Sequence, residues 1–443
     1  MESKKLFKDY KEHVRDNKES YIQEYRRVFK AVEESPAKYK GKPVEFLYQP
    51  LFLTEEDYNR FKTLTDQLMT ILNKVIDKYL KDESFRRHFG FSPLLEKLIL
   101  KDPGYDKNVP MGRFDIFYNY DDGGFQFCEL NTDGSSGMIE QMELQRICQD
   151  SLAVKNLEKK YNVRGFELFQ SWVNAFLENY RQYSKGAEKP QIAIMDWLSG
   201  DPPSEFIAFK EVFEANGCPT VIVDPSWLEY KNNCLYYKDF KIDCIYRRAV
   251  TWEIIEGAHK AMDFIEAYLA GDVCVIGPIR SQIIHNKNIF AILHDEEKTP
   301  FLSNEDRNFV KKHIPFTRIF EAANEELVNY TINHKDAFVL KPMDKYASKG
   351  VRIGRDYSKD EWIKIIQEEA KEEYLLQEFC RLPRIPMAKF NHEDVEFLDF
   401  NYIIGLFMYN ERLQGVYTRT GTKNLIGSIV ECYTAPNFVL SVK

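Results

Sequence analysis

The sequence has no long apolar run, no excess of basic residues and no closely spaced pair of cysteines. No stretch approaches the ~18–20 apolar residues that a membrane-spanning helix needs, and the first residues are charged throughout, without the apolar region of a secretory signal. Lys and Arg number 61 against 69 Asp and Glu, which gives a formal net charge of −8. This balance argues against a general nucleic-acid-binding protein. We therefore expect a cytoplasmic protein that binds neither a membrane nor nucleic acid.

The eight cysteines form no CxxC pair, so neither a zinc site nor a dithiol redox site is indicated. Several lie in apolar, strand-like runs, as expected of buried, reduced thiols. The GxxxxGK[ST] pattern of a Walker loop is also absent. What remains is an ordinary globular composition, with 44% hydrophobic and 29% charged residues. A chain of 443 residues with this composition predicts about two to four domains.

Three regions differ in their hydrophobic pattern. Region 1–160 is helical at first, with Thr54 as the expected N-cap of a long helix, and then contains a strand hairpin over 112–131. Region 161–280 alternates strand and helix patterns, which predicts βαβ units and a small, mostly parallel sheet. Region 281–443 combines strand-like runs with two helix patterns. We predict a mixed α/β (α+β) protein with three domains at these boundaries.

The individual elements of the second and third regions follow from the same patterns. In the second region we expect strands at 191–196, 220–224, 243–246 and 273–276, and helices at 204–215 and 251–269. In the third region we expect helices at about 303–313 and 358–370, and strands at 337–341, 374–379, 401–409 and 413–418.

The hairpin carries four polar side chains whose arrangement depends on the turn. Side chains on a strand alternate between faces. With a three-residue loop over Asp121–Gly123, Asp115 lies opposite Glu129 and Arg113 lies opposite Asn131. All four side chains then share one face. A two-residue loop would shift the register by one residue and divide them between the two faces.

Two carboxylates that face each other repel unless a positive charge lies between them. Asp115, Glu129 and Asn131 carry the oxygen ligands that Mg²⁺ takes, usually together with substrate phosphates. We therefore predict a Mg²⁺ site on this face. The alternative is a solvated sheet face that carries unrelated charges.

A loop rich in small residues follows the hairpin directly. Its sequence TDGSSG contains Ser135 and Ser136, and a helix is expected over 138–150. Free backbone N–H groups, hydroxyls and a helix N-terminus can together receive a carboxylate or a phosphate.

A second candidate for phosphate binding is Lys341, which ends an apolar strand. The loop after it contains Ser348, Lys349 and Gly350. A lysine beside such a loop suits a phosphate, which it binds as a point charge. The alternative is a strand end followed by a surface loop. The next strand pattern, at 374–379, could offer backbone groups of its edge to an adenine ring.

Five sequence blocks together resemble the glutathionylspermidine synthetase family. They follow one another in the same order over about residues 110–430. The blocks are RFD–x13–E–x–N from Arg113 to Asn131 with the serine-bearing loop after it, HNKNIFAILHDE at His285–Glu296, VLKPMDKYASKG at 339–350, LLQEF at 375–379, and YTRTGTKNLIG at Tyr417–Gly427.

The resemblance implies a circularly permuted ATP-grasp fold, in which the metal ligands precede the nucleotide-binding strands. Region 161–280 would then be a pre-ATP-grasp-like domain, and region 281–443 would hold the nucleotide-binding lid and C-terminal core strands. The implied cofactors are ATP and Mg²⁺. The implied site residues are Asp115, Glu129 and Asn131 on the metal, Arg113 and Arg419 in catalysis, Lys287, Lys341, Ser348, Lys349 and Gly350 on the phosphates, Gln377, Glu378 and Phe379 around adenine, and Ser135 and Ser136 near the acid substrate.

The function that this resemblance implies is ATP-dependent ligation of a small-molecule carboxylate to an amine, with release of ADP. The length of the chain leads us to expect only the synthetase-like part of that family, without an amidase domain. Two alternatives remain open: a small-molecule phosphotransferase that uses the same nucleotide site, and a protein that binds ATP without catalysis. The oligomeric state is not indicated.

Overall fold

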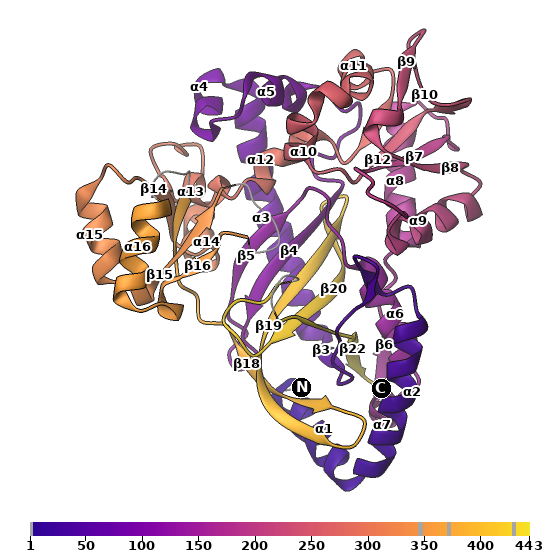
Figure 1. The fold of residues 1–443 in the computed structure, drawn as a ribbon, viewed down its shortest axis with the longest axis vertical. Helices are drawn as coiled ribbons and strands as arrows, with labels where there is room; N and C mark the ends of the chain where they lie inside the picture. The colour runs from indigo at the N-terminus through magenta and orange to yellow at the C-terminus, as the bar shows by residue number, and fades with distance from the viewer. Residues whose placement is uncertain (1–2, 344–348, 370–373, 428–430) are drawn as a thin grey trace.

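The structure is a computed structural model that describes residues 3–343, 349–369, 374–427 and 431–443. A six-stranded antiparallel sheet lies at its centre, with one four-stranded sheet to its left and another to its upper right in Figure 1. We call these the central sheet, the outer sheet and the parallel sheet. The short 3₁₀ helices between the main elements are η1 (Arg87–Phe89), η2 (Pro225–Trp227), η3 (Ala258–Lys260), η4 (Ile279–Ser281), η5 (Lys335–Ala337) and η6 (Gly354–Asp356).

The central sheet combines strands from both ends of the chain. Its strand order is β21-β20-β19-β4-β5, and β18 also pairs with β19. The predicted hairpin is therefore extended by strands that follow it by more than 250 residues. The strands are β4 (Met111–Tyr118), β5 (Phe125–Asn131), β18 (Arg384–Phe390), β19 (Val395–Tyr409), β20 (Arg412–Gly421) and β21 (Tyr433–Ala435).

Helices of the first region pack beside this sheet. The long helix α3 begins after Thr54, which caps it in a reciprocal hydrogen-bonded pair with Asp57, as the sequence predicts. Its buried stripe contacts the central sheet. The elements here are α1 (Ser3–Asp16), α2 (Lys18–Glu34), β1 (Lys38–Tyr39), β2 (Lys42–Pro43), β3 (Leu51–Thr54), α3 (Glu55–Lys81), α4 (Glu83–Arg86), α5 (Pro93–Leu100), α6 (Met138–Cys148), α7 (Leu152–Glu158), β6 (Tyr161–Arg164) and the C-terminal β22 (Asn437–Val442), which pairs with β3 and β6.

The parallel sheet confirms the prediction for the second region, with strand order β13-β12-β7-β8 and every pairing parallel. A three-stranded antiparallel insert, β9-β10-β11, lies between β8 and β12 and was not predicted. The elements are α8 (Gln170–Tyr183), β7 (Ile192–Met195), α9 (Ser204–Ala215), β8 (Thr220–Val223), β9 (Glu229–Lys231), β10 (Cys234–Tyr237), β11 (Phe240–Ile242), β12 (Cys244–Arg247), α10 (Thr251–Glu256), α11 (Met262–Ala270) and β13 (Cys274–Ile276).

The outer sheet has strand order β14-β17-β15-β16 and its own small core, which includes the buried Trp362 and Leu340. Because β17 pairs on both sides, the predicted role of 374–379 as a sheet edge is wrong. The elements are α12 (Gln282–His285), α13 (Asn288–His294), α14 (Asn304–His313), β14 (Thr317–Phe320), α15 (Glu325–Asn333), β15 (Phe338–Pro342), β16 (Arg352–Ile353), α16 (Lys359–Glu369) and β17 (Tyr374–Glu378).

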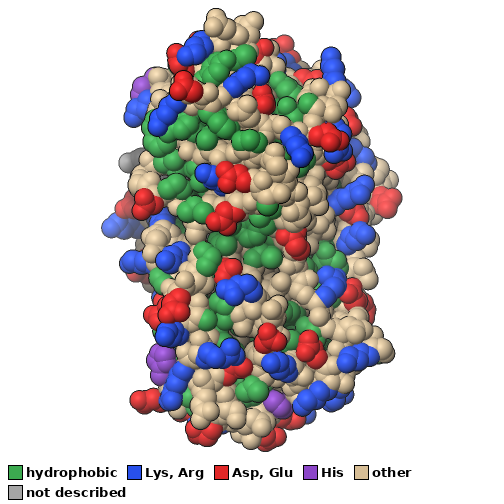
Figure 2. Space-filling model, turned by 90° about the vertical axis from the view of Figure 1, so that its right-hand side faces the viewer, with side chains coloured by type: hydrophobic (Ala, Val, Ile, Leu, Met, Phe, Trp, Pro, Cys, Tyr) green, Lys and Arg blue, Asp and Glu red, His purple; other side chains and the backbone are tan. Residues whose placement is uncertain are grey.

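The surface shows no concentration of one charge on the face drawn in Figure 2, where basic and acidic side chains alternate. Within the described part of the chain, every helix is too short or too polar to cross a lipid bilayer.

Candidate active site

The hairpin register at the site is the one that the sequence predicts. Asp115 lies opposite Glu129, and Arg113 lies opposite Asn131. The route to this register differs from the prediction. The backbone N–H of Asn119 donates to Gly124, so the loop has four residues instead of three. A β-bulge at Cys128 then shifts the register by one residue and restores the predicted pairs.

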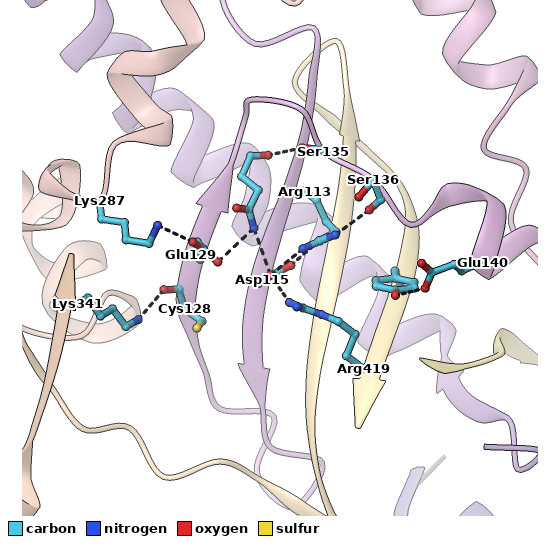
Figure 3. A network of polar contacts seen from close by, with 12 residues as sticks. Arg113, Asp115, Cys128, Glu129, Ser135, Ser136, Glu140, Lys287, Lys341 and Arg419 are labelled. Carbon is cyan, nitrogen blue, oxygen red and sulfur yellow. Dashed lines mark hydrogen bonds and ion pairs between the residues drawn. The ribbon is translucent and has the colours of Figure 1, made fainter. Parts of the chain in front are cut away.

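Asp115 is almost fully enclosed, with 1% of its side chain exposed. Arg113 binds it with two nitrogens, Nε at 2.8 Å from Oδ1 and Nη2 at 3.2 Å from Oδ2. Arg419, on β20, places Nη2 2.5 Å from the same Oδ2 (Figure 3). A solvated sheet face, the alternative considered above, is therefore excluded for Asp115. The Nε of Arg419 is also buried, and it donates to no described residue.

The charge of Glu129 is neutralised by a lysine from outside the hairpin. Lys287, at the start of α13, places its Nζ 2.8 Å from Glu129 Oε1. Burial by itself would raise the pKa of Glu129, but Lys287 and then Lys341 hold it well below its usual range. Asn131 links the two acids, because its Nδ2 lies 3.2 Å from Asp115 Oδ2 and 3.5 Å from Glu129 Oε2.

These side chains fit Mg²⁺ in kind, since two carboxylates and an amide converge on one face. In the structure, however, cationic side chains already contact both carboxylates. Among the described residues, no group of three His, Cys, Asp or Glu side chains could hold a metal ion. A metal at this face therefore needs Lys287 or an arginine to move toward another anion.

A buried ion pair between Glu205 and Arg248 contacts the serine loop. The hydroxyl of Ser135 donates to Asn131 O at 2.7 Å, so it supports the loop. Ser136 is exposed, and its carbonyl accepts from Arg113 Nη1 at 2.7 Å. The sequence predicted that the N-terminus of α6 could receive a carboxylate or phosphate of a ligand, but a side chain of the protein already occupies it. Glu205 accepts the N–H of Gly137 at 3.1 Å and also pairs with Arg248.

A second buried ion pair, which the sequence analysis missed, fixes the start of this loop. Asp133 and Arg247 form it with almost no exposure of either side chain. Asp133 also accepts the backbone N–H of Thr251 at 2.6 Å. Burial would raise the pKa of Asp133, but Arg247 keeps it low. The only signal in the sequence was the position of Asp133 inside the TDGSSG loop.

A narrow cavity of about 100 Å³ lies between the central and outer sheets. Lys341 lines it, and its Nζ donates to Cys128 O at 3.3 Å (Figure 3). Lys287 and the predicted adenine-binding residues also line it, and most of its wall is apolar. The wall includes Val339, Val351, Ile353, Gln377, Glu378, Phe379, Leu382, Ile403, Leu425 and Ile426.

The hydrogen-bonding groups around this cavity differ in whether they already have a partner within the protein. The side chain of Gln377 donates to Thr317 Oγ1 at 2.9 Å. The backbone N–H groups of Glu378 and Phe379 donate to carbonyls within the outer region, so neither is available to an adenine ring. Ser348 lies outside the described residues. Lys349 and Gly350 are described but do not line the cavity. The positive charge of Lys349 instead lowers the pKa of Glu253 on α10.

A larger cleft of about 680 Å³ lies on the other side of the polar network. Glu129 and Arg419 line both spaces, so the network forms their common wall. The cleft wall is slightly more polar than apolar and comes from seven separate segments. It includes Tyr39, Lys42, Glu45, Arg113, Asn131, Asp133, Ser135, Ser136, Glu140, Trp252, His285, Tyr417, Glu431, Tyr433 and Thr434.

No known protein-family model and no curated protein sequence matches this chain. Solved structures do. A glutathione synthetase-like effector from Globodera pallida, in its apo form, superposes with a TM-score of 0.54 at 12% identity, over 94% of this chain and 96% of that one. A gamma-glutamylcysteine synthetase candidate from Methylobacillus flagellatus gives 0.40 at 12% identity, over 82% of each chain. D-alanyl-alanine synthetase A from Vibrio cholerae gives 0.31 at 8% identity, over 58% of this chain and 90% of that one.

At these identities the likeness concerns the fold alone, and of these three structures only the first has a TM-score above 0.5. The hairpin precedes the outer sheet in the chain, as the permuted order requires. The predicted resemblance to glutathionylspermidine synthetases in particular stays a prediction. The predicted mixed α/β fold of ATP-grasp type is confirmed.

Proposed function

We propose that the protein is an ATP- and Mg²⁺-dependent ligase that joins a small-molecule carboxylate to an amine and releases ADP. The observation that carries this proposal is the common wall between the two spaces. One polar network separates a narrow, mainly apolar cavity from the larger cleft. It contains Arg113, Asp115, Glu129 and Arg419. A phosphoryl group transferred at this network would pass from a nucleotide in the cavity to an acid in the cleft.

The cavity suits the nucleotide. Its apolar wall would hold the adenine ring, and Lys287 and Lys341 would face the phosphates. Asp115, Glu129 and Asn131 would hold Mg²⁺, which would supply positive charge against the negative charge that develops during transfer. The phosphates would in turn offer Lys287 a second anion, which frees Glu129 for the metal.

The cleft suits the acid and the amine. Arg113 and Ser136 stand at its inner end, where a substrate carboxylate would attack the γ-phosphate and form an acyl phosphate. Arg419 lines both spaces, and its buried Nε has no hydrogen-bond partner among the described residues, so it would bind an oxygen of the group in transit. The amine then displaces phosphate and leaves an amide. No side-chain nucleophile is required.

The test is a screen for ADP release with pairs of acids and amines in the presence of Mg²⁺, followed by mass analysis of the product. We expect ADP release that requires both partners and yields an amide. A phosphorylated acid that accumulates as the final product would identify a phosphotransferase. Nucleotide binding with no turnover for any pair would favour a binding protein.

A further inference from the structure

Outside the network that separates the two spaces, the polar cleft contains Glu140, on the first turn of α6. Its carboxylate lines the polar cleft (Figure 3). The hydroxyl of Tyr417 donates to Glu140 Oε2, and Thr434 Oγ1 lies 3.1 Å from the same oxygen. Among the described residues, the other oxygen, Oε1, accepts no hydrogen bond, and no cation pairs with this carboxylate.

The environment of Glu140 makes an uncompensated charge costly. Burial raises the pKa of its carboxyl, and the nearby Glu205 raises it further. The other enclosed acids of the region differ in this respect. Asp115, Glu129, Asp133 and Glu205 each pair with an arginine or a lysine. Glu140 is partly buried and lines the cleft, so its carboxylate is enclosed yet within reach of a ligand that could supply a cation.

The position of Glu140 relates it to the reacting groups. The ring of Tyr417 separates it from Arg113, whose guanidinium lies 5.6 Å from the ring centroid. Tyr417 thus contacts both Glu140 and Arg113 on the cleft wall. A substrate bound in the cleft against this wall would present an anionic group to Arg113 and a cationic group to Glu140.

We propose that Glu140 binds an ammonium group of a substrate in the polar cleft, and so selects substrates that carry a cationic nitrogen near the reacting group. This assignment rests on the proposed function of the cleft. The ammonium could belong to the acid substrate, as in an amino acid, or to the amine substrate, as in a diamine. Both have the same chemistry, and the experiment distinguishes them.

The test compares binding of ligand pairs that differ by one ammonium group. L-norleucine against hexanoate probes the acid, and 1,5-diaminopentane against 1-aminopentane probes the amine. Calorimetry is done at pH 7 with and without Mg²⁺ and a non-hydrolysable ATP analogue. We expect the wild type to prefer the ammonium-bearing member of one pair by about tenfold, the scale of one charge-assisted hydrogen bond.

The variant Glu140→Gln keeps an oxygen for Tyr417 and Thr434 but loses the charge, so we expect it to lose this preference. Glu143→Gln, on the same helix and outside the cleft, is the matched control and should keep it. Thermal denaturation verifies that both variants fold, and Glu140→Asp, which keeps the charge, serves if Glu140→Gln does not.

Two results would overturn the proposal: no preference in either pair for the wild type, or a preference that survives in Glu140→Gln. Failure of the proposed ligase function would look different. In that case nucleotide would not bind, or no acid and amine pair would release ADP, while the preference for ammonium could still be measured in the nucleotide-free protein.

Discussion

At the scale of single residues, Arg113 combines two roles that can be separated. Its guanidinium forms a two-point contact with Asp115 and also binds the carbonyl of Ser136. A lysine could keep the charge but not this planar set of contacts. Arg113 would therefore both position the loop and bind the transferring phosphoryl group.

We predict that Arg113→Lys lowers kcat by about 10²-fold, the scale of one preorganised donor, and leaves ATP affinity unchanged. Steady-state rates with the substrates from the ADP screen measure the first quantity, and calorimetry measures the second. Arg146→Lys, whose arginine pairs with Glu143 on the outside of α6, should have wild-type rates. A wild-type rate for Arg113→Lys would show that the arginine only balances charge.

Glu253 on α10 makes stability depend on pH. Burial raises its pKa to about 7, and the neighbouring acids Asp196 and Asp133 contribute. The unfolded chain ionises this group near its ordinary value of 4.5. Between these two values the folded state binds more protons than the unfolded state, so stability contributed by this group falls as pH rises.

Glu253→Gln resembles the protonated form, so we expect it to raise the Tm at pH 8 relative to wild type. The gain should shrink as the pH falls and approach zero below about pH 4.5, where both the folded and the unfolded state bind this proton. Thermal unfolding of both proteins across this range measures the difference. A gain that is independent of pH would contradict the assignment, because it would arise from the substitution and not from titration.

At the scale of elements, the N-terminus of α6 is stabilised by a side chain from α9, which lies more than 60 residues further along the chain. Glu205 on α9 accepts two backbone N–H groups at this end and pairs with the buried Arg248. Removal of one partner leaves the other charge buried without compensation. Such losses cost roughly 3–5 kcal/mol.

We therefore predict that Glu205→Ala lowers the free energy of unfolding by roughly 3–5 kcal/mol. Urea denaturation at pH 7 measures this change. Glu211→Ala is the matched control, because Glu211 lies on the same helix and is exposed. A loss no greater than that of the control would mean that water or a rearranged loop replaces the contact.

The hairpin shows how far element prediction reaches. The alternation of faces correctly places Arg113, Asp115, Glu129 and Asn131 together. The loop length was wrong because Asn119 closes a wider turn, in which its side chain accepts the N–H of Asp121. The bulge at Cys128 compensates. A bulge depends on pairing with the partner strand, so the alternation of residues along one strand does not reveal it.

At the scale of the whole molecule, the balance of charge at the site determines how strongly Mg²⁺ binds there without a nucleotide. Three cations, Arg113, Arg419 and Lys287, contact two carboxylates, so the repulsion that motivated the Mg²⁺ prediction is already relieved. Lys341 adds a further positive charge nearby. A metal ion alone would meet a region with a surplus of positive charge.

We predict that Mg²⁺ binds weakly to the nucleotide-free protein and that ATP increases its affinity, because phosphates attract Lys287 away from Glu129. By linkage, Mg²⁺ must strengthen ATP binding by the same factor. Calorimetric titrations of Mg²⁺, of ATP with a chelator, and of both together measure the coupling. Tight binding of Mg²⁺ without nucleotide would disprove it. In Glu129→Gln the coupling should disappear.

Local pattern was sufficient for much of this protein. Periodicity and turn residues predicted the α3 helix, the parallel sheet and the polar face of the hairpin, because each depends on neighbours along one segment. The tertiary structure alone decided which charges meet. Arg419 reaches Asp115 across 304 positions, and Lys287 reaches Glu129 across 158. Those contacts depend on the order of strands in a sheet and on the packing of elements that are distant in the chain, which no spacing within one segment encodes.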